Sequence, residues 1–305
     1  MSAPRARMPA RWVSEEILAL AAAGPRTGRV SARFESTVHL DLGGFVVAVL
    51  PPGAERMPNG VSVAGALAGA GAPRVGDRAL LARGGVSAGG IEILWDERSQ
   101  HWDARVVRWS ADQRRGLRER AVAILGMALD GAPARRLAET LVRVGGFAAD
   151  DGGALTALES LLAAVRFADS RQAASAGREL AGRGPGLTPA GDDVLAATAL
   201  TLAAAGPAGA GRGAWVAALV PPDLRTLTTS ISATLLELAV RGRGIGPARA
   251  LLDPCRLHER RLRRGVAALR RLGHTSGAIY AVTIGAVALV LAPDENHTNH
   301  DKENR

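Results

Sequence analysis

Cysteine, lysine and aromatic residues are scarce in this sequence of 305 residues. Its single cysteine, Cys255, excludes a disulfide framework within the chain and a zinc site built on cysteines. Aromatic residues make up 3% of the chain, whereas hydrophobic residues as a whole make up 47%. The chain is therefore long and apolar enough for one large or two smaller domains, with cores built mainly from alanine, leucine and valine.

Lysine occurs once, at Lys302, so the basic residues are almost all arginines, and these are spread along the whole chain. A net charge of +9 suits a nucleic-acid partner in principle. However, no basic patch is interleaved with aromatic residues, and no zinc-finger or aromatic RNA-binding motif is present. Together with the 37 glycines, the scattered arginines indicate that the positive charge reflects a compositional bias of the genome and not a basic face selected for binding. We do not expect nucleic-acid binding.

The sequence also lacks a hydrophobic run long enough to cross a membrane. Residues 278–292 form the most apolar stretch, which is shorter than the ~20 residues that a membrane span needs. We expect a buried helix there. Residues 1–12 are basic but have no apolar core of the kind found in signal peptides. The sequence therefore predicts a cytoplasmic protein without a membrane partner.

Hydrophobic periodicity divides the rest of the chain into an α+β fold. Residues 1–26 are predicted to form an N-terminal tail with a short helix over 17–23. Alternating and fully apolar runs, separated by glycine-rich turns, predict a small β-barrel or sandwich over 27–110, with a last strand over 102–109. Helical periodicity follows over 111–293, interrupted by glycine-rich loops. The polar residues 294–305 are predicted to be a disordered tail.

The densest cluster of glycine and proline lies in residues 182–193, which read GRGPGLTPAGDD. Thr188 followed by Pro189 is typical of a helix N-cap with proline at the first helical position. Asp192 and Asp193 then fall in the first helical turn, near the positive end of the helix dipole. Two interpretations stay open: a well-capped buried helix after a tight loop, or a loop that approaches a ligand closely.

Two further helix starts have a similar character. Residues 226–232 read TLTTSIS, and so many hydroxyls suit either a polar pocket or a cap with helix packing. Residues 272–277 read LGHTSG and lead into the apolar run. Helix N-termini with unpaired N–H groups are ready anion sites. His274 could act as a general acid or base, or could be satisfied by a helix-end carbonyl.

Asp192 and Asp193 cannot form a facing carboxylate pair, because neighbouring side chains on a helix point about 100° apart. One of them could bind Mg²⁺, an amide or an ammonium group while the other holds the loop. Arg183 could pair with an anionic substrate. The sequence assigns no metal site, and Mg²⁺ stays open as a cofactor.

Residues 184–193 closely resemble the signature of a bacterial domain-of-unknown-function family. That family includes a subunit of oxamate carbamoyltransferase (AllH-like) and is associated with anaerobic allantoin degradation, a branch of purine catabolism. The stretch around Ser230 and the loop 273–277 are similar to its second and third blocks, and the resemblance extends over about residues 27–292. The family usually has serine where this chain has Ala190, and an apolar Ala278-Ile279-Tyr280 follows the third loop here.

The resemblance implies a multi-subunit carbamoyltransferase system that moves a carbamoyl group between phosphate and an oxamate-like acceptor. We therefore expect a small anionic substrate of the carbamoyl phosphate or oxamate type, bound at glycine-rich helix N-termini, and other protein subunits as partners. The alternative is a non-catalytic small-anion-binding or assembly protein. The candidate catalytic residues are Asp192, Asp193 and His274. The candidate substrate-binding residues are Arg183, Gly184, Gly186, Thr188, Gly191, Ser230, Thr275, Ser276 and Gly277.

Overall fold

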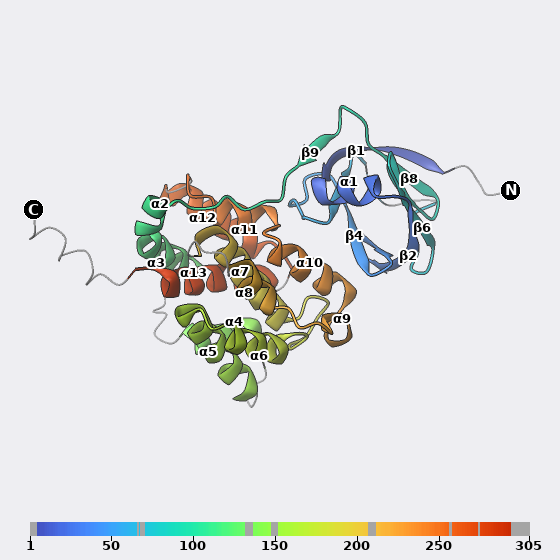
Figure 1. The fold of residues 1–305 in the computed structure, drawn as a ribbon. Coiled ribbons are helices and arrows are strands. Elements are labelled where there is room, and N and C mark those ends of the chain that lie inside the picture. Colours follow the sequence, from blue (N-terminus) through green and yellow to red (C-terminus); the bar gives the residue numbers. More distant parts are fainter. Residues whose placement is uncertain are drawn as a thin grey trace, which may run out of the picture. The chain divides into compact units, whose positions relative to one another are not determined.

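The computed structural model describes residues 5–65, 67, 71–131, 137–147, 152–206, 212–255, 258–273 and 275–293. The predicted tail 294–305 lies outside these residues. The chain divides into two compact units. The first comprises residues 1–105, 229–238 and 243–246, and the second comprises residues 106–228, 239–242 and 247–305. Figure 1 shows that strands dominate the first unit and helices the second.

The first unit contains all of the strands in the described residues. They are β1 (Ala6–Ser14), β2 (Arg26–Arg33), β3 (Val38–Leu42), β4 (Phe45–Leu50), β5 (Gly60–Val63), β6 (Arg78–Ala82), β7 (Gly85–Ala88), β8 (Ile91–Leu94) and β9 (Gln100–Trp102). Eight strands pair in the order β5-β4-β3-β2-β6-β7-β8-β1, and β1 pairs again with β5. This last pairing closes a barrel, which decides between the barrel and the sandwich that the sequence left open. Strand β9 adds to β1 in parallel.

The barrel interior is filled by small and branched side chains, as the low aromatic content requires. Strand β3 alternates between buried and half-buried residues, whereas β4 is buried over almost its whole length. Val13, Leu40 and Leu81 are fully buried in the same cluster. Neighbouring strands approach so closely that a Cβ atom at Gly28 would lie 1.8 Å from the carbonyl oxygen of Asp41.

Residues 6–14, which the sequence placed in an N-terminal tail, form strand β1 instead. The reason is tertiary, because β1 pairs with both β5 and β8 although its own sequence alternates poorly. The short helix is present as α1 (Glu15–Ala22), with Ser14 as its N-cap. The predicted last strand is shorter than expected, since β9 ends at Trp102 and only an isolated bridge follows at Arg105.

Two segments from far along the chain complete the barrel unit. In helix α10 (Ser230–Val240), the hydroxyl of Thr234 accepts a hydrogen bond of 3.0 Å from the backbone N–H of Val46. The backbone N–H of Gly246 donates to the carbonyl of Arg56 at 2.7 Å.

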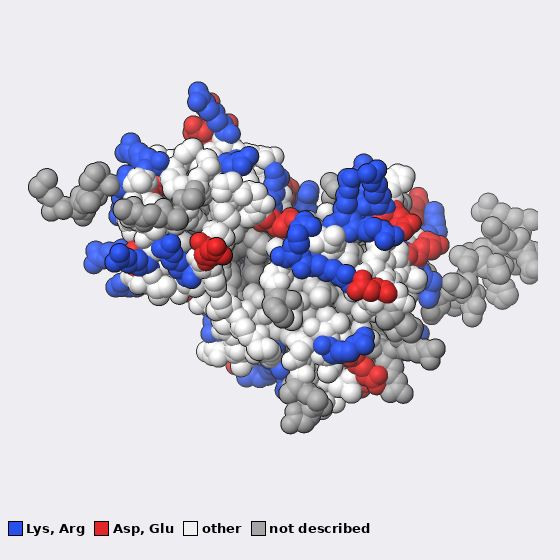
Figure 2. Space-filling view, turned by 180° about the vertical axis from the view of Figure 1, so that it is seen from behind, with Lys and Arg blue, Asp and Glu red and all other residues white. Residues whose placement is uncertain are grey.

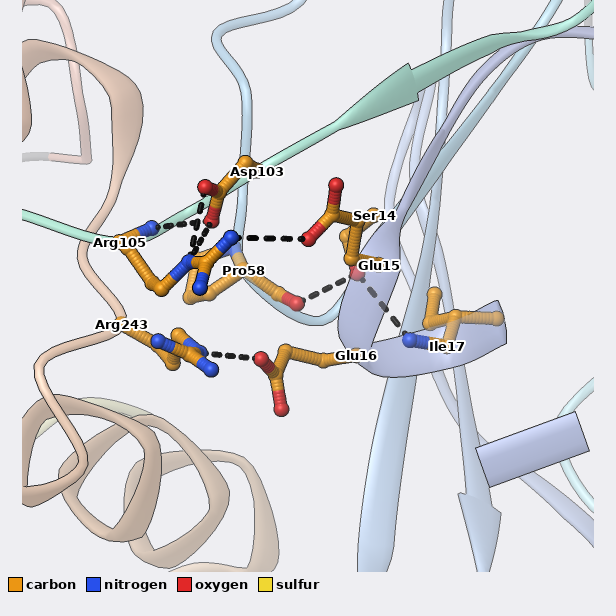
Figure 3. Close-up of polar contacts among 8 residues, drawn as sticks. All are labelled: Ser14, Glu15, Glu16, Ile17, Pro58, Asp103, Arg105 and Arg243. Carbon is orange, nitrogen blue, oxygen red and sulfur yellow. Dashed lines mark hydrogen bonds and ion pairs between the residues drawn. The ribbon is translucent and has the colours of Figure 1, made fainter. Parts of the chain in front are cut away.

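Figure 3 shows how the same unit anchors the start of α1. Arg243 pairs with Glu16, and Arg105 contacts Asp103 at 2.9 Å and Glu15 at 3.9 Å. The Ser14 hydroxyl donates to the carbonyl of Pro58 at 2.6 Å and accepts the N–H of Ile17. Residues from four separate parts of the chain therefore meet around one short helix.

The second unit is helical. Its helices are α2 (Ala111–Arg115), α3 (Leu117–Ala128), α4 (Leu137–Gly145), α5 (Gly152–Phe167), α6 (Ser170–Leu180), α7 (Ala190–Ala205), α8 (Arg212–Ala218), α9 (Leu224–Leu227), α11 (Gly246–Leu251, beginning at the unit boundary), α12 (Glu259–Arg270) and α13 (Ser276–Leu291). Figure 1 shows α7 and α13 surrounded by other helices of this unit. The prediction of a buried helix over 278–292 is confirmed by α13. In α12, residues 262, 265, 266 and 269 form the buried face.

Helices α7 and α13 are apolar around nearly their whole circumference, which is typical of helices in the centre of a core. They pack against each other, and α13 also contacts α3 and α12. Asp192 and Asp193 lie in the first turn of α7, as predicted, and both are buried. Among the helices of the described residues, none combines the length and apolarity that a membrane-spanning segment requires.

Charged side chains do not form one large basic face on the side of the molecule drawn in Figure 2. There, arginines lie interspersed with acidic and uncharged residues on each unit. Several arginines of the helical unit are paired with acidic side chains, as in Arg178 with Asp223 and Arg270 with Asp130.

Candidate functional site

The loop between α6 and α7 is built on glycines with left-handed backbones. Gly182 and Gly184 have φ angles of +72° and +106°. A Cβ atom at Gly182 would lie 1.8 Å from the carbonyl oxygen of Leu227, and one at Gly191 would lie 2.0 Å from that of Leu180. These close approaches hold the loop against the ends of α6 and α9. Gly186, at φ +98°, is exposed and has open space around it.

Thr188 does not cap α7, contrary to the prediction. Pro189 occupies the N-cap position, and its carbonyl accepts the backbone N–H groups of Asp192 and Asp193 at 3.0 and 3.2 Å. The Thr188 hydroxyl turns instead to the hydroxyl of Ser276, 2.9 Å away. Helix α7 therefore begins without a side-chain cap, and the Thr188 hydroxyl joins the first loop to the third.

The N-terminal N–H groups of α7 and α13 are largely engaged within the chain. Gly191 donates to the carbonyl of Arg183 at 2.9 Å, and Gly277 donates to that of Leu272 at 3.1 Å. With the two aspartate N–H groups bonded as well, these helix starts offer fewer free donors than the sequence suggested. Any ligand here depends more on side chains than on the backbone.

Asp192 ties the first loop to the second. Its Oδ1 accepts the backbone N–H of Gly182 at 2.8 Å, and its Oδ2 accepts the hydroxyl of Thr228 in a short hydrogen bond. The side chain is 2% exposed. Because both carboxylate oxygens are bonded inside the fold, Asp192 has a clear structural role.

Asp193 is in a different environment although it is the next residue. It is 4% exposed, and its Oδ2 has no hydrogen-bond partner. The pKa of Asp193 is raised to about 8: burial is the largest cause and raises it, a hydrogen bond from the Ser276 side chain lowers it, and the nearby Asp192 charge raises it. Near neutral pH this carboxyl group is therefore mainly protonated.

Tyr280 lies one helical turn beyond Ser276 on α13 and is buried. Burial raises the pKa of its phenol well above the ordinary value, with smaller contributions from the Asp193 and Asp192 charges. The phenol therefore stays neutral and adds a polar group to the same part of the core.

The structure brings together side chains from all three predicted loops: Thr188, Asp192, Asp193, Thr228 and Ser276. Other predicted site residues lie elsewhere or have other roles. Arg183 is half-buried, with its Nε donating to the carbonyl of Glu179. Ser230 belongs to the barrel unit. Thr275 is exposed, and its side chain makes no capping bond.

Gly277 serves helix packing, because a Cβ atom there would lie 1.7 Å from the carbonyl oxygen of Leu269. His274 lies outside the described residues. Mg²⁺ binding stays a prediction. Within the described ranges, no three histidine, cysteine, aspartate or glutamate side chains gather where they could hold a metal ion.

Sequence reasoning missed two residues of this cluster. Thr228 lies inside the hydroxyl-rich stretch 226–232, so its density of threonine was a usable signal, but nothing marked this particular hydroxyl. Tyr280 belongs to an apolar run, and only the packing of α13 against α7 places it near the two aspartates.

Comparison with known families supplies one match. Residues 180–288 match the family model described as oxamate carbamoyltransferase subunit AllH. These residues span all three loops but only a little over a third of the chain. Neither the curated proteins nor the solved structures contain a match to this chain. The predicted resemblance is therefore confirmed for residues 180–288, which are AllH-like.

Proposed function

We propose that this protein is a subunit of an oxamate carbamoyltransferase-like system, and that its three converging loops bind a small substrate of the carbamoyl phosphate or oxamate type. The observation that carries the proposal is the overlap between the family match and the buried cluster. Residues 180–288 contain Asp192, Asp193, Thr228 and Ser276.

The cluster has the chemical groups that such a substrate requires. Carbamoyl and oxamate groups carry carbonyl oxygens, which accept hydrogen bonds, and amide N–H groups, which donate them. Ser276 and Thr188 can do both, and Asp193 retains an unpartnered oxygen. A buried polar atom without a partner costs roughly 1–3 kcal/mol. A ligand that satisfies Asp193 would offset that cost.

A thermal-shift titration with oxamate, carbamoyl phosphate, inorganic phosphate and Mg²⁺ tests the proposal. A ligand at a hundred times its dissociation constant stabilises the folded state by ~2.7 kcal/mol. We expect oxamate or carbamoyl phosphate to raise the melting temperature of the wild type. The shift should fall in Asp193→Ala and stay in Asp130→Asn, which alters an exposed carboxylate of the same unit.

The alternative is a non-catalytic small-anion-binding or assembly protein. This alternative is favoured by one observation: Asp192, Gly182 and Gly191 all make contacts that a purely structural loop would need. In that case no substrate-type ligand would shift the melting temperature, or the shift would be equal in Asp193→Ala. Co-purification with neighbouring-gene products would then be the informative experiment.

A further inference from the structure

We propose that Asp193 meets the ligand as a neutral carboxylic acid that donates a hydrogen bond, so that the site selects a carbonyl or amide oxygen over a second negative charge. This inference rests on the proposed function and specifies which end of the substrate the buried cluster binds. It begins from the different surroundings of two neighbouring aspartates.

The unpartnered oxygen is the first observation. Asp193 Oδ2 lies in a helical core without a hydrogen-bond partner, whereas both oxygens of Asp192 accept hydrogen bonds from Gly182 and Thr228. A carboxylate in an apolar interior is costly unless it is paired. Because the Asp192 carboxylate is its neighbour, ionisation of Asp193 would add a second buried negative charge. Protonation removes this cost and leaves an O–H group able to donate.

The second observation is the set of hydroxyls around Asp193. Thr188 and Ser276 are 2.9 Å apart and half-buried, and the Ser276 side chain is also hydrogen-bonded to Asp193. When Ser276 donates to Asp193, Thr188 must donate to Ser276. In that order one carboxyl oxygen accepts from Ser276, and the unpartnered Oδ2 can carry the acid proton. Thr188, Ser276 and Asp193 thus form a series of polar side chains that runs from two half-buried hydroxyls to the buried carboxyl group.

Among the residues that the structure describes, two titratable groups lie beside Asp193, and neither carries a positive charge that would favour its ionised form. Asp192, on the same helix, adds negative charge, and Tyr280, from the packed helix α13, remains an uncharged phenol near neutral pH. Burial is the main reason that the pKa of Asp193 rises to about 8. The acid form should therefore be lost above that pH, and with it the ability to donate.

A neutral donor beside a fixed carboxylate discriminates among small ligands. It can donate to the amide carbonyl of oxamate. Oxalate has the same skeleton but carries a second carboxylate in place of the amide, and that charge would be placed near Asp192. The prediction is therefore stronger binding of oxamate than of oxalate, by about tenfold, which is the size expected for one unfavourable buried charge interaction in a partly screened site.

Isothermal titration of the full-length protein with oxamate and oxalate near neutral pH tests this selection. Asp193→Asn is the informative variant, because its amide keeps the shape of the acid and can still donate. We expect it to bind oxamate within about threefold of the wild type, while Asp193→Ala weakens binding about tenfold. Asp130→Asn serves as the matched surface control and should leave both affinities unchanged.

The pH dependence of oxamate affinity is a second test, because a purely structural role of Asp193 would not produce it. Oxamate binding by the wild type should weaken as the pH rises through about 8, and binding by Asp193→Asn should not follow that change. Infrared difference spectra between these two proteins should show a protonated-carboxyl band in the wild type near neutral pH. This spectrum needs no ligand.

The outcomes separate the two proposals. Equal or tighter binding of oxalate, loss of oxamate binding in Asp193→Asn as large as in Asp193→Ala, or no protonated-carboxyl band would each overturn the neutral-acid inference, even if the protein binds substrate. Failure of oxamate and carbamoyl phosphate to bind any protein would overturn the proposed function and the ligand selection built on it. A protonated-carboxyl band in that case would still identify Asp193 as a neutral acid.

Discussion

At the scale of the residue, Asp192 and Asp193 are adjacent in the sequence but have different surroundings and different chemical roles. The helical twist turns their side chains toward different neighbours. Asp192 meets the Gly182 N–H and the Thr228 hydroxyl, which satisfy a carboxylate. Asp193 meets the α7–α13 core, where a charge is poorly solvated. Asp192 therefore holds the two loops together, whereas Asp193 is a buried carboxyl group with one unpartnered oxygen.

This difference predicts an unusual pH dependence of stability. The pKa of Asp193 is about 8 in the folded state and about 3.8 when unfolded, so between these pH values only the folded state retains the proton. The free energy of unfolding should fall as pH rises from about 4 to 8, by a few kcal/mol in total. Chemical denaturation across that range, compared with Asp193→Asn, isolates the contribution. A pH profile identical in the two proteins would show that Asp193 does not titrate in this way.

At the scale of the element, the start of α7 depends on how closely its backbone approaches α6. Gly191 is buried in the first turn, and a Cβ atom there would lie 2.0 Å from the carbonyl oxygen of Leu180. A backbone carbonyl cannot move aside as a flexible side chain can. Any residue larger than glycine must therefore separate the two helices or distort the loop that positions the aspartates.

We expect Gly191→Ala to destabilise the protein by roughly 1–3 kcal/mol, which is the cost of overpacking in a rigid site. Gly126→Ala is the matched control, because Gly126 lies in helix α3 with open space at its Cβ position. That change should be neutral or stabilising by up to ~1 kcal/mol. Denaturant unfolding of both variants measures the difference, and equal stabilities would contradict the packing argument.

At the scale of the whole molecule, the barrel unit is not a continuous piece of sequence. Residues 229–238 and 243–246 belong to it although they follow most of the helical unit in the chain. Thr234 satisfies the N–H of Val46, and Arg243 pairs with Glu16. These contacts couple the formation of the barrel to segments that are synthesised much later.

A fragment of residues 1–105 should therefore be much less stable than the same unit in the full chain. The N–H of Val46 and the carboxylate of Glu16 would lose their partners. Fusing residues 229–246 to the fragment through a flexible linker should restore much of the stability. Melting temperature and binding of a hydrophobic dye measure both proteins. A fragment that melts cooperatively at the temperature of the fused protein would show that the late segments are dispensable.

The sequence by itself determined the features that depend on local pattern. It predicted the helical second half, the buried apolar helix α13, the first-turn aspartates, and the β-rich first half as a barrel or sandwich. Residues 184–193 also indicated the AllH-like resemblance, now matched over residues 180–288. Each of these features follows from hydrophobic periodicity, from the positions of glycines or from a contiguous motif. They can therefore be predicted without knowledge of contacts between distant residues.

Only the tertiary structure decided the features that depend on distant contacts. Strand β1 forms because its backbone pairs with β5 and β8, and the pairing of β1 with β5 closes the barrel. Thr188 joins Ser276 because the N-cap of helix α7 lies one residue later, at Pro189, and α13 brings Ser276 within 2.9 Å of the threonine hydroxyl. The pKa of Asp193 rises because the helical core buries its side chain, an effect of solvation that neighbouring residues in the sequence do not encode.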